Sequence, residues 1–296
     1  MKGIRMEIQL VRNWRLLWAL VRRDLRMRYI GSIMGLFWSV INPLILLIIY
    51  IFIFSLIFQF GGDSEPAGGA GPAAETKRQI VNFPVFLCCG LLPWNALMEA
   101  LLGATAIIAG SGGLIKKAVF PTAILPMQSI VASFVNLLIT MCLLGVFLVV
   151  IDVAGIFPGS WPGWKFLLIL PLMALQFALI VGPCYFFATV NVFFRDMGQI
   201  LAAVMNFLFW ATPIVYPARL ATERLPWIEV FYFLNPFTHL IRLYREALYV
   251  DRSAWTQELS CSTTTSVVYL LAIGALAYIA GKYIFTRSQP HFVDEV

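Results

Sequence analysis

The sequence predicts an all-α protein that is embedded in a membrane. Apolar residues make up 60% of its 296 residues and charged residues only 12%, whereas about a quarter of the residues in a soluble domain are charged. Several apolar runs reach the length of about 20 residues that a helix needs to cross the hydrocarbon core. A surface so poor in charge excludes a soluble enzyme, a disordered chain and a fibre.

The apolar runs predict six transmembrane helices within a single transmembrane domain over residues 1–296. Their expected ranges are 33–60, 83–109, 121–151, 166–194, 198–216 and 263–285. Six crossings put both termini on one side, and thirteen of the 21 Lys and Arg residues fall on that side. Because Lys and Arg concentrate in cytoplasmic loops, both termini are expected in the cytoplasm. The chain would then be a multi-pass protein of the plasma membrane, which is the inner membrane of a Gram-negative host.

An amphipathic helix is expected before the first span, in a cytoplasmic segment over residues 1–31. Apolar residues recur there at spacings of three and four, which places them on one helix face. They are Ile4, Ile8, Val11, Trp14, Trp18, Val21 and Leu25. Arg15, Arg22 and Arg26 lie at the edge of this stripe, where long side chains reach lipid headgroups. The segment is either a general basic anchor or a site for a particular lipid.

Two loops differ in composition from the spans. Residues 61–79 are rich in Gly, Ala and Pro, which predicts a flexible extracytoplasmic loop. Residues 217–262 are rich in aromatic side chains but carry five basic and five acidic residues, too many charges to cross lipid. We expect an extracytoplasmic hairpin of two helices there, broken at Asn235-Pro236. It would be re-entrant or interfacial, since irregular backbone at membrane depth must be buried in protein or line a wet cavity.

Motifs for covalent chemistry are absent from the sequence. There is no G-x-x-x-x-G-K-[ST] loop for nucleotide phosphates, no G-x-S-x-G and no H-E-x-x-H. His239 and His291 and the five scattered cysteines give no metal-ligand spacing. We therefore expect no enzyme, no metal and no cofactor in this chain. The positive charge follows from membrane topology, so nucleic acid is not an expected partner.

One long motif joins the basic helix to the first span. Residues 23–43 read RDLRMRYIGSIMGLFWSVINP, in which Gly31 and Gly35 allow another backbone to approach closely. Further motifs follow in order: GLLPW at 90–94, LIKK with FP at 114–121, NVFFRD at 191–196, TPIVYP at 212–217 and NP at 235–236. With these motifs the chain resembles, over nearly its whole length, the transmembrane subunit of type-two ABC exporters. The similar branch exports O-antigen, capsule or wall-teichoic polymers (the Wzm-like permeases).

The resemblance implies partners as well as a fold. It implies a homodimer with a pore between the two copies, driven by two cytoplasmic ABC ATPase subunits that bind the ATP and magnesium. The cargo would be a polysaccharide on an undecaprenyl-type lipid, taken from the cytoplasmic leaflet. Two other functions stay open: an exporter permease for a drug or small lipid, and a membrane-embedded glycan or acyl transferase. A stand-alone channel or secondary transporter would predict an internal repeat, which the sequence does not show.

The resemblance also implies two groups of cytoplasmic site residues. The loop over 110–121 would dock on the ATPase through Leu114, Ile115, Lys116, Lys117 and Phe120. The lipid phosphate would enter at Arg22, Arg23, Arg26 and Arg28, since guanidinium groups suit phosphate oxygens. The alternative for both groups is plain anchoring at the membrane surface.

Three further sets of candidates lie in the spans and the hairpin. The resemblance implies that the first and fifth spans line the pore, where the aromatic stripes are Tyr50, Phe54 and Phe58, and Phe209, Thr212 and Tyr216. Aromatic rings suit a sugar path because they present apolar faces, but packing or lipid contact is the alternative. Glu99 is an ionisable residue inside a span, which indicates either function or a structural pair. His239, Arg242, Arg245 and Glu246 lie on neighbouring turns and predict a salt-bridged gate helix more than an acid/base site.

Overall fold

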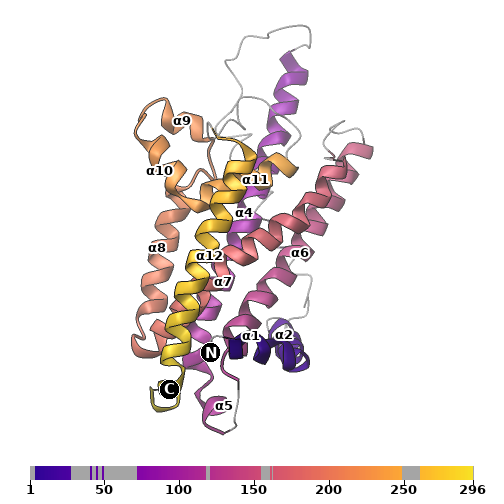
Figure 1. Ribbon diagram of the computed structural model, residues 1–296. Coiled ribbons are helices and arrows are strands. Elements are labelled where there is room, and N and C mark those ends of the chain that lie inside the picture. Colours follow the sequence, from indigo (N-terminus) through magenta and orange to yellow (C-terminus); the bar gives the residue numbers. More distant parts are fainter. Residues whose placement is uncertain are drawn as a thin grey trace.

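The computed structural model describes residues 4–27, 41, 45, 49, 72–117, 121–154, 161, 163–248 and 261–295. Every regular element within these residues is a helix (Figure 1), so the predicted all-α class is confirmed for this part of the chain. The elements are α1 (Ile4–Arg12), α2 (Trp14–Met27), α4 (Pro72–Gly110), α5 (Gly112–Lys117), α6 (Ile124–Val153), η3 (Gly163–Leu168), α7 (Ile169–Phe193), α8 (Met197–Ala211), α9 (Ala218–Thr222), α10 (Ile228–Leu234), α11 (Pro236–Leu248), α12 (Thr263–Ser288), η4 (Gln289–His291) and α13 (Phe292–Glu295).

Four segments of the described chain are long and apolar enough to cross a membrane. They are Val85–Gly110, Ile124–Val150, Gly163–Phe193 and Thr263–Glu295. These segments correspond to the second, third, fourth and sixth predicted spans. The first predicted span, 33–60, lies outside the described residues except for positions 41, 45 and 49, which are helical.

The fifth predicted span ends earlier than expected. Helix α8 has 15 residues and stops at Ala211, five residues before the predicted end. A helix of that length is roughly 22 Å long, which is less than the hydrocarbon core of about 30 Å. Thr212 is extended, with φ −92° and ψ 138°, because the residue before a proline is disfavoured in the helical region. Pro213 therefore ends the helix inside the range that we predicted as a span.

The predicted loop over 61–79 is wrong in its second half. Helix α4 begins at Pro72 and continues for 39 residues. Proline suits the first turn of a helix, where its missing N–H is not needed, and the Ala, Glu, Lys and Arg that follow favour helix. The first part of the loop, 61–71, lies outside the described residues.

The N-terminal helix is divided and has two apolar faces. Asn13 separates α1 from α2, and its side-chain amide donates to the carbonyl of Gln9. Leu17, Leu20 and Val21 are buried against α6. Of the predicted stripe, Ile8, Val11, Trp14 and Trp18 are exposed on this chain, whereas Val21 belongs to the buried face. One face therefore fixes α2 to the bundle, and the other is left for the membrane.

Helix α12 packs closely along α7. The two helices have small residues where they cross, and Gly182 and Gly281 face one another there. A Cβ on Gly274 would lie 3.2 Å from the carbonyl oxygen of Ala178. Glycine is needed at these positions because it lets the two backbones approach each other. Helix α4 packs against α6 and α7 on another side of α7.

The two ends of the bundle carry different elements (Figure 1). Helices α1, α2, α5 and α13 lie at one end, and α9, α10 and α11 lie at the other. The first and last described helices therefore share an end, as the sequence predicted for the termini. We call the end with α9 to α11 the hairpin end.

Candidate functional site

The break between α10 and α11 falls at Asn235, as the sequence predicted, and the re-entrant or interfacial placement of the hairpin stays a prediction. Asn235 is extended, with φ −81° and ψ 111°, because Pro236 follows it. Its Oδ1 accepts a hydrogen bond from the backbone N–H of Phe237 at 3.0 Å. Its Nδ2 donates to Oγ1 of Thr212 at 2.8 Å. One amide thus shapes the bend and fixes it to the segment that follows α8.

Arg245 connects the same segment to α11 and α4. Its side chain is 1% exposed. Nη1 donates to the carbonyl oxygen of Pro213 at 2.8 Å, and Nη2 donates to that of Ile214 at 2.6 Å. The guanidinium carbon lies 3.5 Å from the ring centroid of Phe86. Because Pro213 interrupts the helix, these carbonyls need donors from elsewhere, and Arg245 supplies them.

A second buried link joins α4, α7 and α11 through Gln176. Its Nε2 donates to the carbonyl oxygen of Pro93 at 2.9 Å, and its Oε1 accepts from Oη of Tyr244 at 2.9 Å. Gln176 is fully buried. The hairpin is therefore held against the spans by hydrogen bonds that are sheltered from water, which makes α11 part of the bundle.

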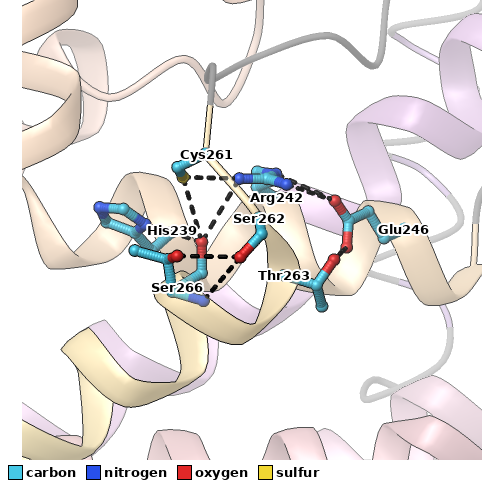
Figure 2. A network of polar contacts seen from close by, with 8 residues as sticks. His239, Arg242, Glu246, Cys261, Ser262, Thr263 and Ser266 are labelled. Carbon is cyan, nitrogen blue, oxygen red and sulfur yellow. Dashed lines mark hydrogen bonds and ion pairs between the residues drawn. The ribbon is translucent and has the colours of Figure 1, made fainter.

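Arg242 is the centre of a polar network at the hairpin end (Figure 2). Its Nε and Nη2 donate to Oε1 of Glu246 at 3.0 and 2.9 Å, and Oε2 of Glu246 accepts from Oγ1 of Thr263 at 2.9 Å. Its Nη1 lies 2.8 Å from Sγ of Cys261 and 3.4 Å from Oγ of Ser266. The network ties α11 to the start of α12, and it contains the ion pair that the predicted gate helix requires.

Both ring nitrogens of His239 have partners. Nε2 lies 2.8 Å from the carbonyl oxygen of Phe233, and Nδ1 lies 2.9 Å from Oγ of Ser266. A carbonyl only accepts, so Nε2 carries the proton and Nδ1 accepts from the serine hydroxyl. Burial lowers the pKa of His239 below its usual value, so the ring is neutral at pH 7. This arrangement favours a structural histidine, and the described residues contain no group of His, Cys, Asp and Glu that could hold a metal ion.

The predicted pore residues of the fifth span have different surroundings. Phe209 is half-buried and packs on Trp94, with ring centroids 5.9 Å apart. Tyr216 is half-buried, and its hydroxyl donates to the carbonyl oxygen of Trp210 at 2.8 Å. Thr212 is fully buried under Asn235, so it packs inside the chain and presents no surface to a pore. Phe209 and Tyr216 keep a partly exposed surface, and their pore role stays a prediction.

The remaining pore candidates belong to the first predicted span. Tyr50, Phe54 and Phe58 lie outside the described residues.

The predicted coupling loop forms a short helix at one tip of the molecule. Helix α5 lies between α4 and α6 at the end that holds the termini, and α13 packs against it. Ile115 is 6% exposed and belongs to the core, which leaves it little surface for a partner. Leu114 is half-buried and Lys116 is exposed. The side chain of Lys117 and all of Phe120 lie outside the described residues.

The predicted phosphate site lies on α2. Arg22, Arg23 and Arg26 are exposed, and they follow the buried stretch that fixes α2 to α6. They are therefore accessible at the end of the bundle that holds the termini. Arg28 lies outside the described residues.

Glu99 has a polar partner on a neighbouring span. Nδ2 of Asn136 donates to its Oε2 at 3.1 Å, which joins α4 to α6. This contact supports the structural alternative for Glu99. Asn136 was not singled out from the sequence, although a lone amide in an apolar run is itself a signal.

A contact between α1 and α12 was also missed. Oε1 of Glu7 on α1 accepts from Nζ of Lys282 and from Oη of Tyr278, both on α12, the second at 2.7 Å. Burial alone would raise the pKa of Glu7, but the hydrogen bonds from Lys282 and Tyr278 outweigh it and lower the pKa below its usual value. The partners are separated by more than 270 residues, so no local pattern reveals them.

Comparisons with known proteins show the family of the chain. Residues 15–249 match the ABC-2 type transporter membrane family, and the chain belongs to that family. It is 28% identical over 273 residues to the O-antigen export system permease protein RfbA of Myxococcus xanthus, covering 92% of this chain and 95% of the relative. It is 28% identical over 286 residues to RfbA of Klebsiella pneumoniae, covering 96% and 99%. It is 23% identical over 258 residues to the polysialic acid transport protein KpsM of Escherichia coli, covering 86% and 90%.

Proposed function

We propose that this chain is the membrane subunit of an ATP-driven exporter that moves a lipid-linked polysaccharide across the plasma membrane. The observation that carries the proposal is the match to the ABC-2 type transporter family over most of the chain. Relatives of nearly equal length are named for export of O-antigen or polysialic acid, which favours a polysaccharide over a drug or a small lipid. The chain would work as a homodimer with two separate ATPase subunits.

A partner must supply the energy, because the sequence has no loop for nucleotide phosphates. We propose that the ATPase contacts α5, which lies at the tip of the end that holds the termini. Helices α4 and α6 flank α5 directly and both are long enough to cross the membrane. A push on α5 would therefore move two spans. This assignment puts both termini in the cytoplasm. The chain itself lies in the plasma membrane, which is the inner membrane of a Gram-negative host.

The coupling proposal predicts an effect of charge reversal on α5. Lys116→Glu replaces an exposed cation at the tip, so the partner ATPase should bind about tenfold more weakly, a typical cost when an interface charge is reversed. Arg15→Glu is the matched control, because Arg15 is exposed on α2 and away from the tip. Binding is measured by pull-down of the ATPase with the full chain in detergent. Equal binding of the ATPase by both variants would show that α5 is not part of the coupling interface.

For the cargo, we propose a path that starts at the exposed arginines of α2 and ends at the hairpin. Arg22, Arg23 and Arg26 would hold the lipid phosphate at the cytoplasmic surface. Phe209 and Tyr216 on or after α8 would present aromatic surface to the sugar chain. The hairpin would close the far end of the path, with the Arg242–Glu246 pair bracing its helix.

Depletion of the chain in its host tests the function. The surface polysaccharide should disappear and the lipid-linked polymer should accumulate inside the cell, because synthesis continues without export. If the polymer that accumulates inside the cell has its normal size and structure, the defect lies in export and not in a transferase activity. An unchanged surface polymer together with sensitivity to a drug would favour the small-molecule exporter instead.

A further inference from the structure

A groove of about 1030 Å³ opens between η3, α7, α11 and α12 at the hairpin end. Its size is typical of a site for a small molecule. Most of the described side chains that line it are apolar, such as Leu172 and Leu271. Ala174 and Ala178 lie one turn apart on α7 and line it as well, and their small side chains leave the space open. None of the proposed transport steps uses this groove.

The polar lining residues lie at the helix ends, and the apolar lining continues deeper into the bundle. Lys165 is in η3, before α7, and Thr263 is the first residue of α12. Ala178 and Leu271 line the same groove more than two turns further along α7 and α12. A membrane lipid has this form, with a polar headgroup above an apolar chain. Both helices are long enough to cross the bilayer, so the groove runs in the direction of lipid acyl chains.

The charges in the groove favour an anion. Two cations, Lys165 and Arg245, and one acid, Glu246, line it among the described residues. The carboxylate of Glu246 is paired with Arg242, and the guanidinium of Arg245 donates to backbone carbonyls. Lys165 has no hydrogen bond or ion pair within the described part of the chain. Among the charged groups that line the groove, the ammonium of Lys165 is thus available to bind a ligand, and a phosphate complements its charge.

We propose that this groove binds one anionic glycerophospholipid from the membrane leaflet at the hairpin end. Its phosphate contacts Lys165, and one acyl chain lies along Leu172, Val267 and Leu271. A lipid pyrophosphate fits less well, because it brings two phosphates to one free ammonium beside the carboxylate of Glu246. The bound lipid fills the space behind α11 and supports the hairpin. This inference does not depend on the nature of the exported cargo.

Native mass spectrometry of the full chain in detergent tests the groove with phosphatidylglycerol as the probe. Lys165→Gln should weaken binding about tenfold, the effect of losing one charge-assisted contact. Ala174→Phe should abolish binding by filling the groove. The matched controls are Arg224→Gln, which removes an exposed cation outside the groove, and Ala280→Phe, which adds bulk on an exposed face of α12. Both controls should bind as the unaltered chain does.

Three results would overturn the proposal. One is unchanged phosphatidylglycerol binding by Lys165→Gln, a partly exposed position where the substitution leaves the core intact. Another is an equal loss in the Arg224→Gln control. The third is a polyprenyl phosphate that displaces phosphatidylglycerol at lower concentration, which would assign the groove to a cargo lipid. Normal surface export in cells depleted of the chain, together with the expected lipid binding, would count against the proposed function alone.

Discussion

Replacement of Arg245 by Met should loosen the whole hairpin end. The substitution keeps an unbranched side chain but removes the guanidinium that donates to the carbonyls of Pro213 and Ile214. Each hydrogen bond to a charged donor contributes about 1.5–3 kcal/mol, and the contact over Phe86 adds about 1–2 kcal/mol when it is shielded from water. The relieved desolvation of a buried charge offsets part of this sum. The net loss of stability is therefore about 3–5 kcal/mol.

A thermal unfolding scan of the purified chain in detergent measures this loss. A loss of that size lowers the Tm by roughly 10 °C, since each kcal/mol is worth about 2–4 °C in proteins of comparable length. Hydrogen exchange should rise first at residues 212–216, because the carbonyls of Pro213 and Ile214 have lost the guanidinium that donates to them. Arg224→Met is the control at an exposed arginine and should shift the Tm by less than about 2 °C. An Arg245→Met protein that unfolds within 2 °C of the unaltered chain would refute the bracing role.

Three more substitutions test other contacts. Glu7→Gln should free α1 from Lys282, which a spin label on α1 would report as increased mobility. Because folding lowers the pKa of Glu7, the contact is complete above the usual carboxyl pKa of about 4.3. The same spin label should become mobile in the unaltered chain as the pH falls through the lowered pKa. Gly281→Ala should cost about 1–3 kcal/mol, because its Cβ would meet the carbonyl of Gly182; an unchanged Tm would show that α7 and α12 can separate without loss. Gln176→Leu should cost about 2–3 kcal/mol, since it removes two buried hydrogen bonds between helices, and an unfolding scan with no shift would mean that water replaces them.

Local chemistry explains which elements could be predicted from the sequence. Long apolar runs gave the four crossing segments, and the Asn235-Pro236 pair gave the hairpin bend, because both signals act over a few residues. The early end of α8 could have been found in the same way, since Thr212 precedes a proline. So could the start of α4, where Pro72 opens a helix-favouring stretch. These two errors came from giving apolar or flexible composition more weight than proline position.

The contacts that hold the site together could not be predicted in this way. Arg245 was expected in a salt-bridged gate, and no local pattern predicts its hydrogen bonds to backbone carbonyls more than 30 residues away. Gln176 reaches Tyr244 across 68 residues. Such pairs depend on how the helices pack, and the sequence alone carries no pattern for them. Arg242 and Glu246 are the exception, because an i,i+4 pair on one helix is local.

Reconstitution into vesicles tests the central claim that this chain is a passive membrane subunit powered by a separate ATPase. The purified chain is inserted alone or together with its cytoplasmic ATPase, and both ATP hydrolysis and movement of a lipid-linked polysaccharide are followed. The account predicts that neither occurs with the chain alone and that both occur, and depend on ATP, when the ATPase is added. Hydrolysis of ATP or ATP-driven movement of the polymer by the chain alone would contradict the account.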